Sequence, residues 1–429
     1  MMDFTSLSKN ELKERLIELN SIYAKFVSSN LKLDMSRGRP GAEQLDLSMD
    51  MLEFHNPSDD FKTASGADTR NYGLLDGIPE AKELFAKMLE ISPKEIILGG
   101  NSSLSIMHDT VARAMQFGVN DSSMPWGKLP KVKFICPSPG YDRHFAITEL
   151  FQIEMIPVEM SQDGPDMDTV ERLVAEDDSI KGIWCTPKYS NPDGITYSDE
   201  VVDRLAGMKT AADDFRIFWD NAYVVHHLTD QPDHLKNMME ACKVAGNPDR
   251  VFMFASTSKV TFPGAGIAMM AASESNIARI KKLLAFKTIG PDKMNQLRHI
   301  RFLKDMDGIN RHMKKHAAIL KPKFDMVLDI LESELGGKNI SCWNKPNGGY
   351  FISFNTMPGC AAATVKMAAD AGVVLTPAGA TYPYGKDPQD RNIRIAPTLP
   401  TISELKTAME LLCVCVQIVA INKLMEIMN

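Results

Sequence analysis

The sequence predicts an α/β protein. A large three-layer domain on a mostly parallel seven-stranded sheet would be joined to a smaller α+β domain. Apolar runs alternate with stretches long enough for crossover helices, which is typical of a parallel or mixed sheet covered on both faces. The seven runs lie at 95–100, 131–137, 151–159, 181–187, 215–220, 250–257 and 266–273. A Lys-rich helical stretch over 276–335 and shorter runs at 348–355, 373–377 and 392–397 indicate the second unit.

The N-terminal segment begins with apolar residues at helical spacing, among them Leu12, Leu19 and Phe26, so we expect a helix over 5–33 capped by Ser6 or Ser8. The Gly/Pro-rich stretch 34–48 is expected to hold no regular element.

Another loop is expected over 64–79, with a helix from Pro79, and a last amphipathic helix over 402–428 is expected to pair with the first. We expect residues 1–50 to form an N-terminal helix and loop that belong to the small domain. Residues 51–305 would form the large domain, and residues 306–429 the C-terminal small domain.

Composition excludes several classes of protein. Lys and Arg total 48 against 55 Asp and Glu, so the chain lacks the basic excess of a nucleic-acid binder. We expect no apolar stretch of the roughly 18 residues that span a bilayer, no signal peptide at the start, and no metal site. Seven scattered cysteines without a CxxC pair favour buried, reduced thiols in a cytosolic protein, with a catalytic cysteine as the alternative.

Polar residues follow the apolar runs, at the edge where such sheets bind ligands. Lys259 ends the segment ASTSK after the run at 250–257, and a partly desolvated amine there can form a Schiff base with an aldehyde cofactor. The hydroxyls of Ser256 and Ser258 could donate to a phosphate. The alternative is an ordinary surface lysine.

Asp220 ends the apolar run FRIFWD, so its carboxylate needs a partner. A protonated ring nitrogen of an electron-sink cofactor is one candidate, and the start of a helix is the other. Tyr223 could reach the phenolic oxygen of the same ring. Asn191, in TPKYSNPDG, either forms a turn alone or also aims its amide at the cofactor.

Three further features suit a cofactor site. GGNSSLS at 99–105 precedes a helical stretch and is a natural phosphate cradle. Tyr141 could stack on an aromatic ring or simply pack at a loop edge. Arg394 is a cation inside a short strand, so it needs an anion, which is either a substrate carboxylate or a structural partner.

In this order the motifs resemble the fold type I, pyridoxal-phosphate-dependent aminotransferases of class I, over nearly the whole chain. Tyr72-Gly73 with Gly77 is similar to the family's Tyr-x-x-x-x-Gly segment, and Pro-Asn-Gly-Gly-Tyr-Phe at 346–351 is close to its small-domain signature. SRGRP and STSKVTFPGAG most resemble a bacterial branch of aspartate aminotransferases allied to the MocR-like group.

The resemblance implies pyridoxal 5'-phosphate bound to Lys259 as an internal aldimine, with Lys259 also the proton shuttle. It implies that Asp220 holds the pyridine nitrogen, that Tyr223 and Asn191 contact the ring oxygen, and that Tyr141 stacks on the ring. Arg394 would clamp the substrate α-carboxylate, with Gly38 and Asn191 beside it. The phosphate would be held by Asn101, Ser102, Ser103, Ser256 and Ser258, with Tyr72 donated across a homodimer.

One position departs from the family. Gly266 stands where an arginine usually pairs with the phosphate, seven residues after the lysine, so that charge must be met otherwise. The implied reaction is a ping-pong amino transfer between aspartate and 2-oxoglutarate, with Arg37, Arg39, Arg70 or the partner chain reading the distal carboxylate. Aromatic or 2-aminoadipate-like substrates remain open. So does a MocR-type regulator, although residues 1–50 offer little length for its DNA-binding domain.

Overall fold

The computed structural model describes residues 3–54, 58 and 60–428. Its centre is a seven-stranded sheet in the order β2-β8-β7-β6-β5-β3-β4, in which β4, β3, β5, β6 and β7 run parallel and β8 is antiparallel to both its neighbours. Each of the seven predicted runs supplies one strand, so this part of the prediction is confirmed. The strands are β2 (Ile96–Leu98), β3 (Lys133–Ser138), β4 (Glu154–Glu159), β5 (Ile180–Cys185), β6 (Arg216–Asp220), β7 (Val251–Ser256) and β8 (Ala268–Ala271).

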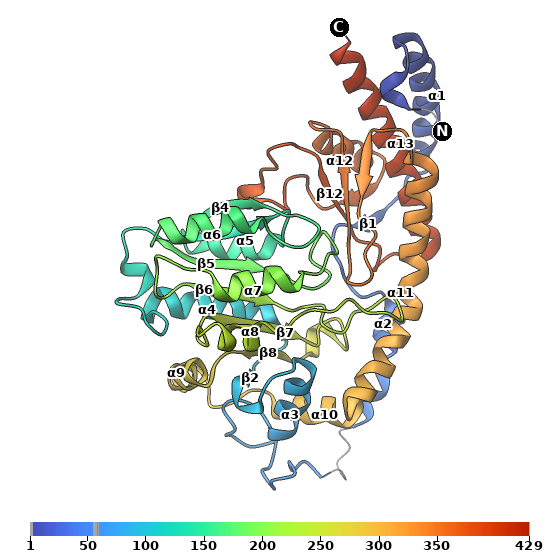
Figure 1. Cartoon of the computed structure of the whole chain (residues 1–429). Helices are drawn as coiled ribbons and strands as arrows, with labels where there is room; N and C mark the ends of the chain where they lie inside the picture. The colour runs from blue at the N-terminus through green and yellow to red at the C-terminus, as the bar shows by residue number, and fades with distance from the viewer. Residues whose placement is uncertain (1–2, 55–57, 59, 429) are drawn as a thin grey trace.

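Both faces of this sheet are buried. Alternate residues of the central strands enter two separate cores: Phe134, Trp184 and Phe218 enter one, and Ile135, Ile183 and Ile217 enter the other. This is why the strands read as continuous apolar runs rather than as alternating ones. Helices pack around the sheet (Figure 1), namely α3 (Pro79–Met88), α4 (Ser103–Phe117), α5 (Asp142–Leu150), α6 (Met167–Glu176), α7 (Asp199–Gly207), α8 (Met238–Val244), α9 (Glu274–Leu284) and α10 (Lys293–Leu303).

A smaller unit holds a third core. Its antiparallel sheet has the order β12-β10-β9, and a separate parallel pair joins β1 to β11. The long helix α11 runs beside both units along one side of the molecule (Figure 1). The elements are α1 (Lys9–Ser28), β1 (Leu33–Met35), α2 (Ala42–Asp46), α11 (Met306–Leu335), β9 (Ser341–Trp343), β10 (Ile352–Thr356), α12 (Ala361–Asp370), β11 (Val373–Leu375), β12 (Asn392–Ile395) and α13 (Ile402–Ile427).

The N-terminal segment departs from the prediction in two respects. The helix expected over 5–33 is shorter, because a separate 3-10 turn spans Phe4–Ser6 and α1 spans only Lys9–Ser28. Ser8 caps α1 as expected, through a reciprocal capping box with Glu11. The stretch 34–48, expected to be irregular, contains most of β1 and all of α2. The expectation is wrong because β1 is fixed by pairing with β11, a strand about 340 residues later in the sequence. The domain limits 1–50, 51–305 and 306–429 remain a prediction.

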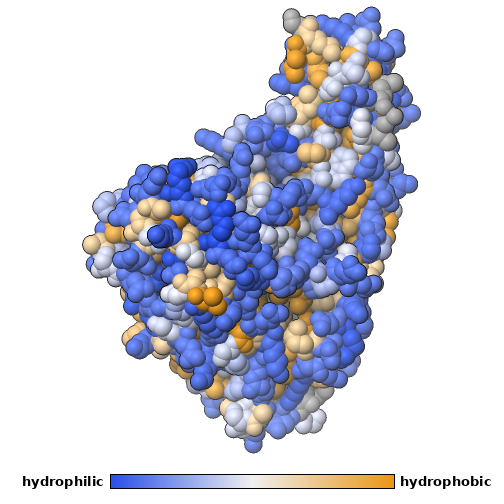
Figure 2. All heavy atoms as spheres, viewed as in Figure 1, coloured by the Kyte–Doolittle hydropathy of each residue, from blue (hydrophilic) through white to orange (hydrophobic). Residues whose placement is uncertain are grey.

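The C-terminal helix corrects a second expectation. By length and composition, α13 is apolar enough to cross a membrane, contrary to the sequence analysis. It packs against α1, α11 and α12, and 72 % of its apolar window is buried inside the protein, as in a core helix. The predicted pairing of the first and last helices is confirmed. Figure 2 shows a mostly hydrophilic face, with apolar side chains near the projecting ends of these two helices.

The cysteines follow the prediction except at one position. Six of the seven thiols are buried, and Cys342 is exposed because it lies on the short, partly exposed strand β9. All seven are free thiols.

Candidate active site

The candidate residues gather at one edge of the large sheet. Parallel strands end on the same side, so the segments after β3, β5, β6 and β7 meet there. Antiparallel β8 begins at this edge, since Ser256 at the end of β7 pairs with Ala268 at the start of β8. The edge therefore carries Tyr141, Asn191, Asp220, Ser256 and Lys259.

Asp220 is the last residue of β6 and is 2 % exposed. His144 Nε2 lies 3.0 Å from one carboxylate oxygen, Oδ2. The other oxygen, Oδ1, is buried and has no hydrogen-bond partner within the described part of the chain. A buried carboxylate oxygen without a partner is costly, and a ring N–H is one group that would satisfy it.

His144 was not singled out by the sequence analysis. It lies on α5 three residues after Tyr141, and the two rings meet edge to face at 4.9 Å between centroids. Its other neighbour is Trp184 on β5, on which it stacks at 4.4 Å and 9°. The spacing of one helical turn from Tyr141 was the available signal.

Lys259 lies half-buried in the loop after β7. Its Nζ is 4.9 Å from the ring centroid of Tyr223 and 5.5 Å from that of Tyr350, and these two rings stack 6.1 Å apart. Burial lowers the pKa of the amine; the Asp220 carboxylate acts in the opposite direction, and Arg394 lowers the pKa further. The net effect favours the neutral, nucleophilic form.

The loop before α4 and the lysine loop are bonded to each other. Ser256 Oγ donates to Ser258 Oγ at 3.0 Å, and Ser258 Oγ donates to the carbonyl of Asn101, also at 3.0 Å. The Asn101 amide donates to the carbonyls of Pro263 and Gly264. Ser102 stands at the N-cap of α4 without a side-chain capping bond, and Ser103 is the first helical residue. Hydroxyls and a helix N-terminus thus converge, which suits an anion.

Gly266 fits closely beneath this cradle. A Cβ there would lie 3.0 Å from Thr257 Oγ1 and 3.2 Å from the carbonyl oxygen of Phe262. Thr257 Oγ1 itself accepts from the peptide N–H of Ile267. A longer side chain at 266 would therefore have to displace this packing.

Arg394 lies on β12 at the opposite end of the site and is 5 % exposed. Its Nη1 donates to Asp142 Oδ1 at 2.9 Å and to Asn191 Oδ1 at 3.1 Å. The guanidinium lies 4.8 Å from the Phe351 ring centroid. Gly38 approaches the same ring so closely that a Cβ would be 2.5 Å from Phe351 Cζ. The predicted residues Arg394, Asn191 and Gly38 are thus brought to one place.

The remaining predicted residues lie apart. The Tyr72 side chain projects from the loop before α3 and is 81 % exposed. Arg37 and Arg39 are exposed on the loop around Gly38. Arg70 pairs with Asp68 at 2.6 Å and lies over the Phe61 ring.

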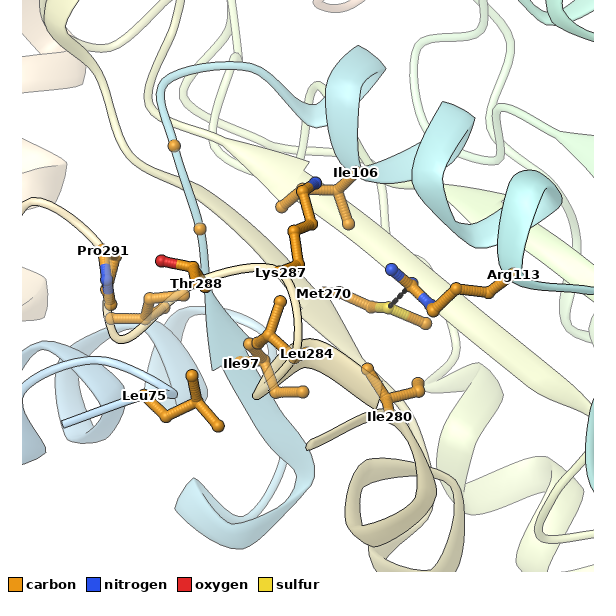
Figure 3. A pocket seen from close by; sticks show the side chains of 13 residues that line it. Leu75, Ile97, Ile106, Arg113, Met270, Ile280, Leu284, Lys287, Thr288 and Pro291 are labelled. Carbon is orange, nitrogen blue, oxygen red and sulfur yellow. Dashed lines mark hydrogen bonds between the residues drawn. The ribbon is translucent and has the colours of Figure 1, made fainter. Parts of the chain in front are cut away.

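An apolar cavity of about 220 Å³ adjoins the glycine loop (Figure 3). Arg113 enters it from α4 and donates to Thr110 Oγ1 and to the sulfur of Met270. Lys287 and Thr288 also line it, and the rest of its wall is mostly apolar, including Leu75, Ile97, Ile106, Ile280, Leu284 and Pro291.

Comparisons with known proteins agree with this geometry. The family model described as aspartate amino-transferase matches residues 7–428. A putative aminotransferase of Mycolicibacterium smegmatis is 48 % identical over 99 % of both chains. An aspartate aminotransferase of Corynebacterium glutamicum is 45 % identical over 96 % of this chain and 94 % of its own. A crystal structure of an aspartate transaminase from C. glutamicum has a TM-score of 0.96 at 43 % identity, covering 99 % of both chains. The predicted fold, the type I fold of pyridoxal-phosphate enzymes, is confirmed, and the chain belongs to the aspartate amino-transferase family.

Proposed function

We propose that this aminotransferase-family protein uses pyridoxal 5'-phosphate to move an amino group from aspartate to 2-oxoglutarate in a ping-pong reaction. The observation that carries the cofactor is the unpartnered Asp220 Oδ1, buried at the edge where Lys259 presents its amine. When bound, pyridoxal phosphate supplies an aldehyde that condenses with amines and a ring that accepts electrons.

Asp220 would hold the pyridine N–H through Oδ1, while His144 keeps Oδ2 in place. Tyr141 would stack on the ring, and the Tyr223 hydroxyl and the Asn191 amide would contact its phenolic oxygen. Burial raises the pKa of Tyr223, so its hydroxyl stays protonated and can donate.

Lys259 would act as the reactive amine and, once released by the substrate, as the base that takes the α-proton and returns it. Its lowered pKa suits both roles, because each needs the neutral amine.

The phosphate would sit at the N-terminus of α4, held by Ser102, Ser103, Ser256 and Ser258. Asn101 would support these groups through its carbonyl, which accepts from Ser258. The hydroxyls and the helix end take the place of the arginine that Gly266 leaves out.

Arg394 would bind the substrate α-carboxylate, and Gly38 would leave room beside it. Arg37 and Arg39 are better placed than Arg70 to bind the distal carboxylate of the substrate. Both are exposed next to Gly38, whereas the Arg70 guanidinium is engaged by Asp68. Aspartate as the amino donor is supported by the name of the 45 % identical relative from C. glutamicum.

Two measurements test this function. Full-length protein supplied with pyridoxal phosphate should gain a visible chromophore that borohydride erases and that Lys259→Ala lacks. A panel of amino acids with 2-oxoglutarate should show the highest kcat/KM for aspartate. Higher kcat/KM values for aromatic or 2-aminoadipate-like donors would overturn aspartate as the substrate and leave the cofactor proposal intact. Protein that takes up no vitamin B6 compound would overturn both proposals.

We also propose a homodimer in which Tyr72 crosses to the partner's phosphate. Tyr72, Phe286 and Ile289 are 81, 92 and 61 % exposed. The last two lie in the segment 284–291, which supplies Leu284, Lys287, Thr288 and Pro291 to the wall of the apolar cavity in Figure 3. Large exposed apolar side chains of this kind are typical of a surface that a partner protein covers. Phe286→Asp should shift sedimentation towards the monomer, whereas Val244→Asp, at an 81 % exposed position on α8, should not. The free thiols support a cytosolic location.

A further inference from the structure

A hydrogen-bonded cluster beneath the lysine has no part in the chemistry proposed above. It consists of Gln44 on α2, His312 and His316 on α11, Tyr350 before β10, and the carbonyl of Val260. We call it the Gln44 junction. It ties together four segments of the chain, and one of its members, Val260, directly follows Lys259.

The orientation of Gln44 follows from its neighbours. The peptide N–H of Gly41 donates to Gln44 Oε1 at 3.2 Å, so the oxygen end of the amide must face Gly41. The Nε2 end then faces the Tyr350 hydroxyl at 2.9 Å and His316 Nδ1 at 3.1 Å, which uses both of its protons. The Gln44 side chain is fully buried, so these bonds have no competition from water.

The same bond fixes the tautomer of His316. Since Nδ1 accepts from Gln44, the ring proton is on Nε2, which donates to the carbonyl of Val260 at 3.0 Å. His312 Nε2 donates to that carbonyl too, at 2.7 Å. Burial lowers the pKa of both rings, that of His316 to about 4, so both remain neutral near pH 7. Two imidazoles thus anchor the carbonyl of Val260, the residue that follows Lys259.

The Gln44 junction is also connected to both the Lys259 side and the Arg394 side of the candidate site. Tyr350, held by Gln44, lies against the Lys259 amine at 5.5 Å. Its neighbour Phe351 lies against Arg394 at 4.8 Å and packs on Gly38. The segment from Gly38 to Gln44 therefore contacts the arginine side at one end and the lysine side at the other.

We propose that Gln44 is a positioning residue that holds the Tyr350 ring against the Lys259 amine and so couples the loop beside Arg394 to the lysine. The proposal rests on the proposed function only in taking Lys259 as the reactive amine. An aromatic face near an ammonium stabilises the charged form, so loss of the Gln44 bond should lower the pKa of Lys259 by about half a unit to one unit.

The test measures Lys259 directly, in full-length protein freed of cofactor. The rate at which [¹³C]formaldehyde and cyanoborohydride methylate Lys259 is followed by peptide mass spectrometry across pH, which gives its pKa. Gln44→Met keeps the volume and removes the bonds, and the pKa should fall. Asp220, Arg394, Tyr223 and His226, the other titratable or charged groups acting near the amine, remain in every variant.

Gln417→Met is the matched control. Gln417 is equally buried, but it lies on α13 and donates to the carbonyl of Cys413 in its own helix. Its replacement removes a buried amide hydrogen bond elsewhere in the fold and should leave the Lys259 pKa unchanged. A folded Gln44→Met protein with the pKa of the control would overturn the proposal.

Tyr350→Phe supplies a second, independent variant that keeps the ring and removes the hydroxyl. It should shift the Lys259 pKa in the same direction, and the double variant Gln44→Met/Tyr350→Phe should shift it no further than the larger single change. Additive shifts in the folded variants would refute the coupling. An unshifted Lys259 pKa in Tyr350→Phe would refute it even if Gln44→Met fails to fold. Because no cofactor is present, this outcome is independent of whether the protein transaminates aspartate.

Discussion

The two ends of the candidate site are held in different ways. The Asp220 end is built on the large sheet alone: the carboxylate ends a central strand, and His144 and Trp184 stack behind it. The Arg394 end joins the two sheets, because Asn191 follows β5 and Asp142 lies on α5, whereas Arg394 itself lies on β12 of the three-stranded sheet. A rigid end suits the cofactor, which stays, and an end with exchangeable partners suits a substrate, which leaves.

Breaking the rigid end should have the largest effect. Asp220→Asn removes the negative charge that would keep the ring nitrogen protonated, so kcat should fall about 10³-fold while KM changes little. Asp214→Asn is the matched control, since Asp214 is also a buried aspartate but lies in the turn before β6 and pairs with Lys181 there. It should cost stability and leave kcat unchanged. Retention of more than a tenth of kcat in Asp220→Asn would refute the assigned role.

Replacing Arg394, at the other end of the site, should affect substrate binding instead. Arg394→Lys keeps the charge and loses the planar pair of donors, so KM should rise about 10- to 100-fold for every amino acid, with a smaller change in kcat. Arg216→Lys, at a buried arginine on β6 that donates to the carbonyls of Phe215 and Asn120, is the control and should affect stability alone. A loss confined to kcat would show that Arg394 does not bind the carboxylate.

The contrast between the two ends also explains what the sequence could predict. The residues after β6 and β7, Asp220 and Lys259, were foreseeable because strands buried on both faces are plain in the sequence and their ends mark the ligand edge. His144 and Gln44 were not, because their roles depend on which way a helix faces and on partners up to 272 residues away. For the same reason, their dependence on partners far away in the sequence, β1 and α2 could not be predicted.

A pH measurement sharpens the comparison at the Arg394 end. Asp193, two residues after Asn191, is 8 % exposed, and burial raises its pKa from 3.8 to about 7, against a smaller opposing bond from Ser353 on β10. Between these pH values the folded state holds a proton that the unfolded state has lost. The free energy of unfolding should therefore fall as the pH rises from 3.8 to about 7, and then level off.

Asp193→Asn should flatten that fall by about 2 kcal/mol between pH 5 and pH 8, as measured by urea denaturation. Asp163→Asn, at an exposed aspartate before α6, is the control and should leave the profile unchanged. An unaltered slope in Asp193→Asn would show that the carboxyl is ionised in the folded protein.

The smallest effect separates the two interpretations of Arg394 that the sequence left open. Asp142 is about one-third exposed, so its ion pair with Arg394 contributes no more than about 1 kcal/mol. If a substrate carboxylate takes over this bond, Asp142→Asn removes a competitor, and KM should fall by up to about fivefold at constant kcat. If the pair instead holds the guanidinium in its working orientation, KM should rise. Steady-state kinetics with one amino donor distinguishes the two, because the sign of the change differs: a fall identifies Asp142 as a placeholder for the substrate, and a rise as a structural support.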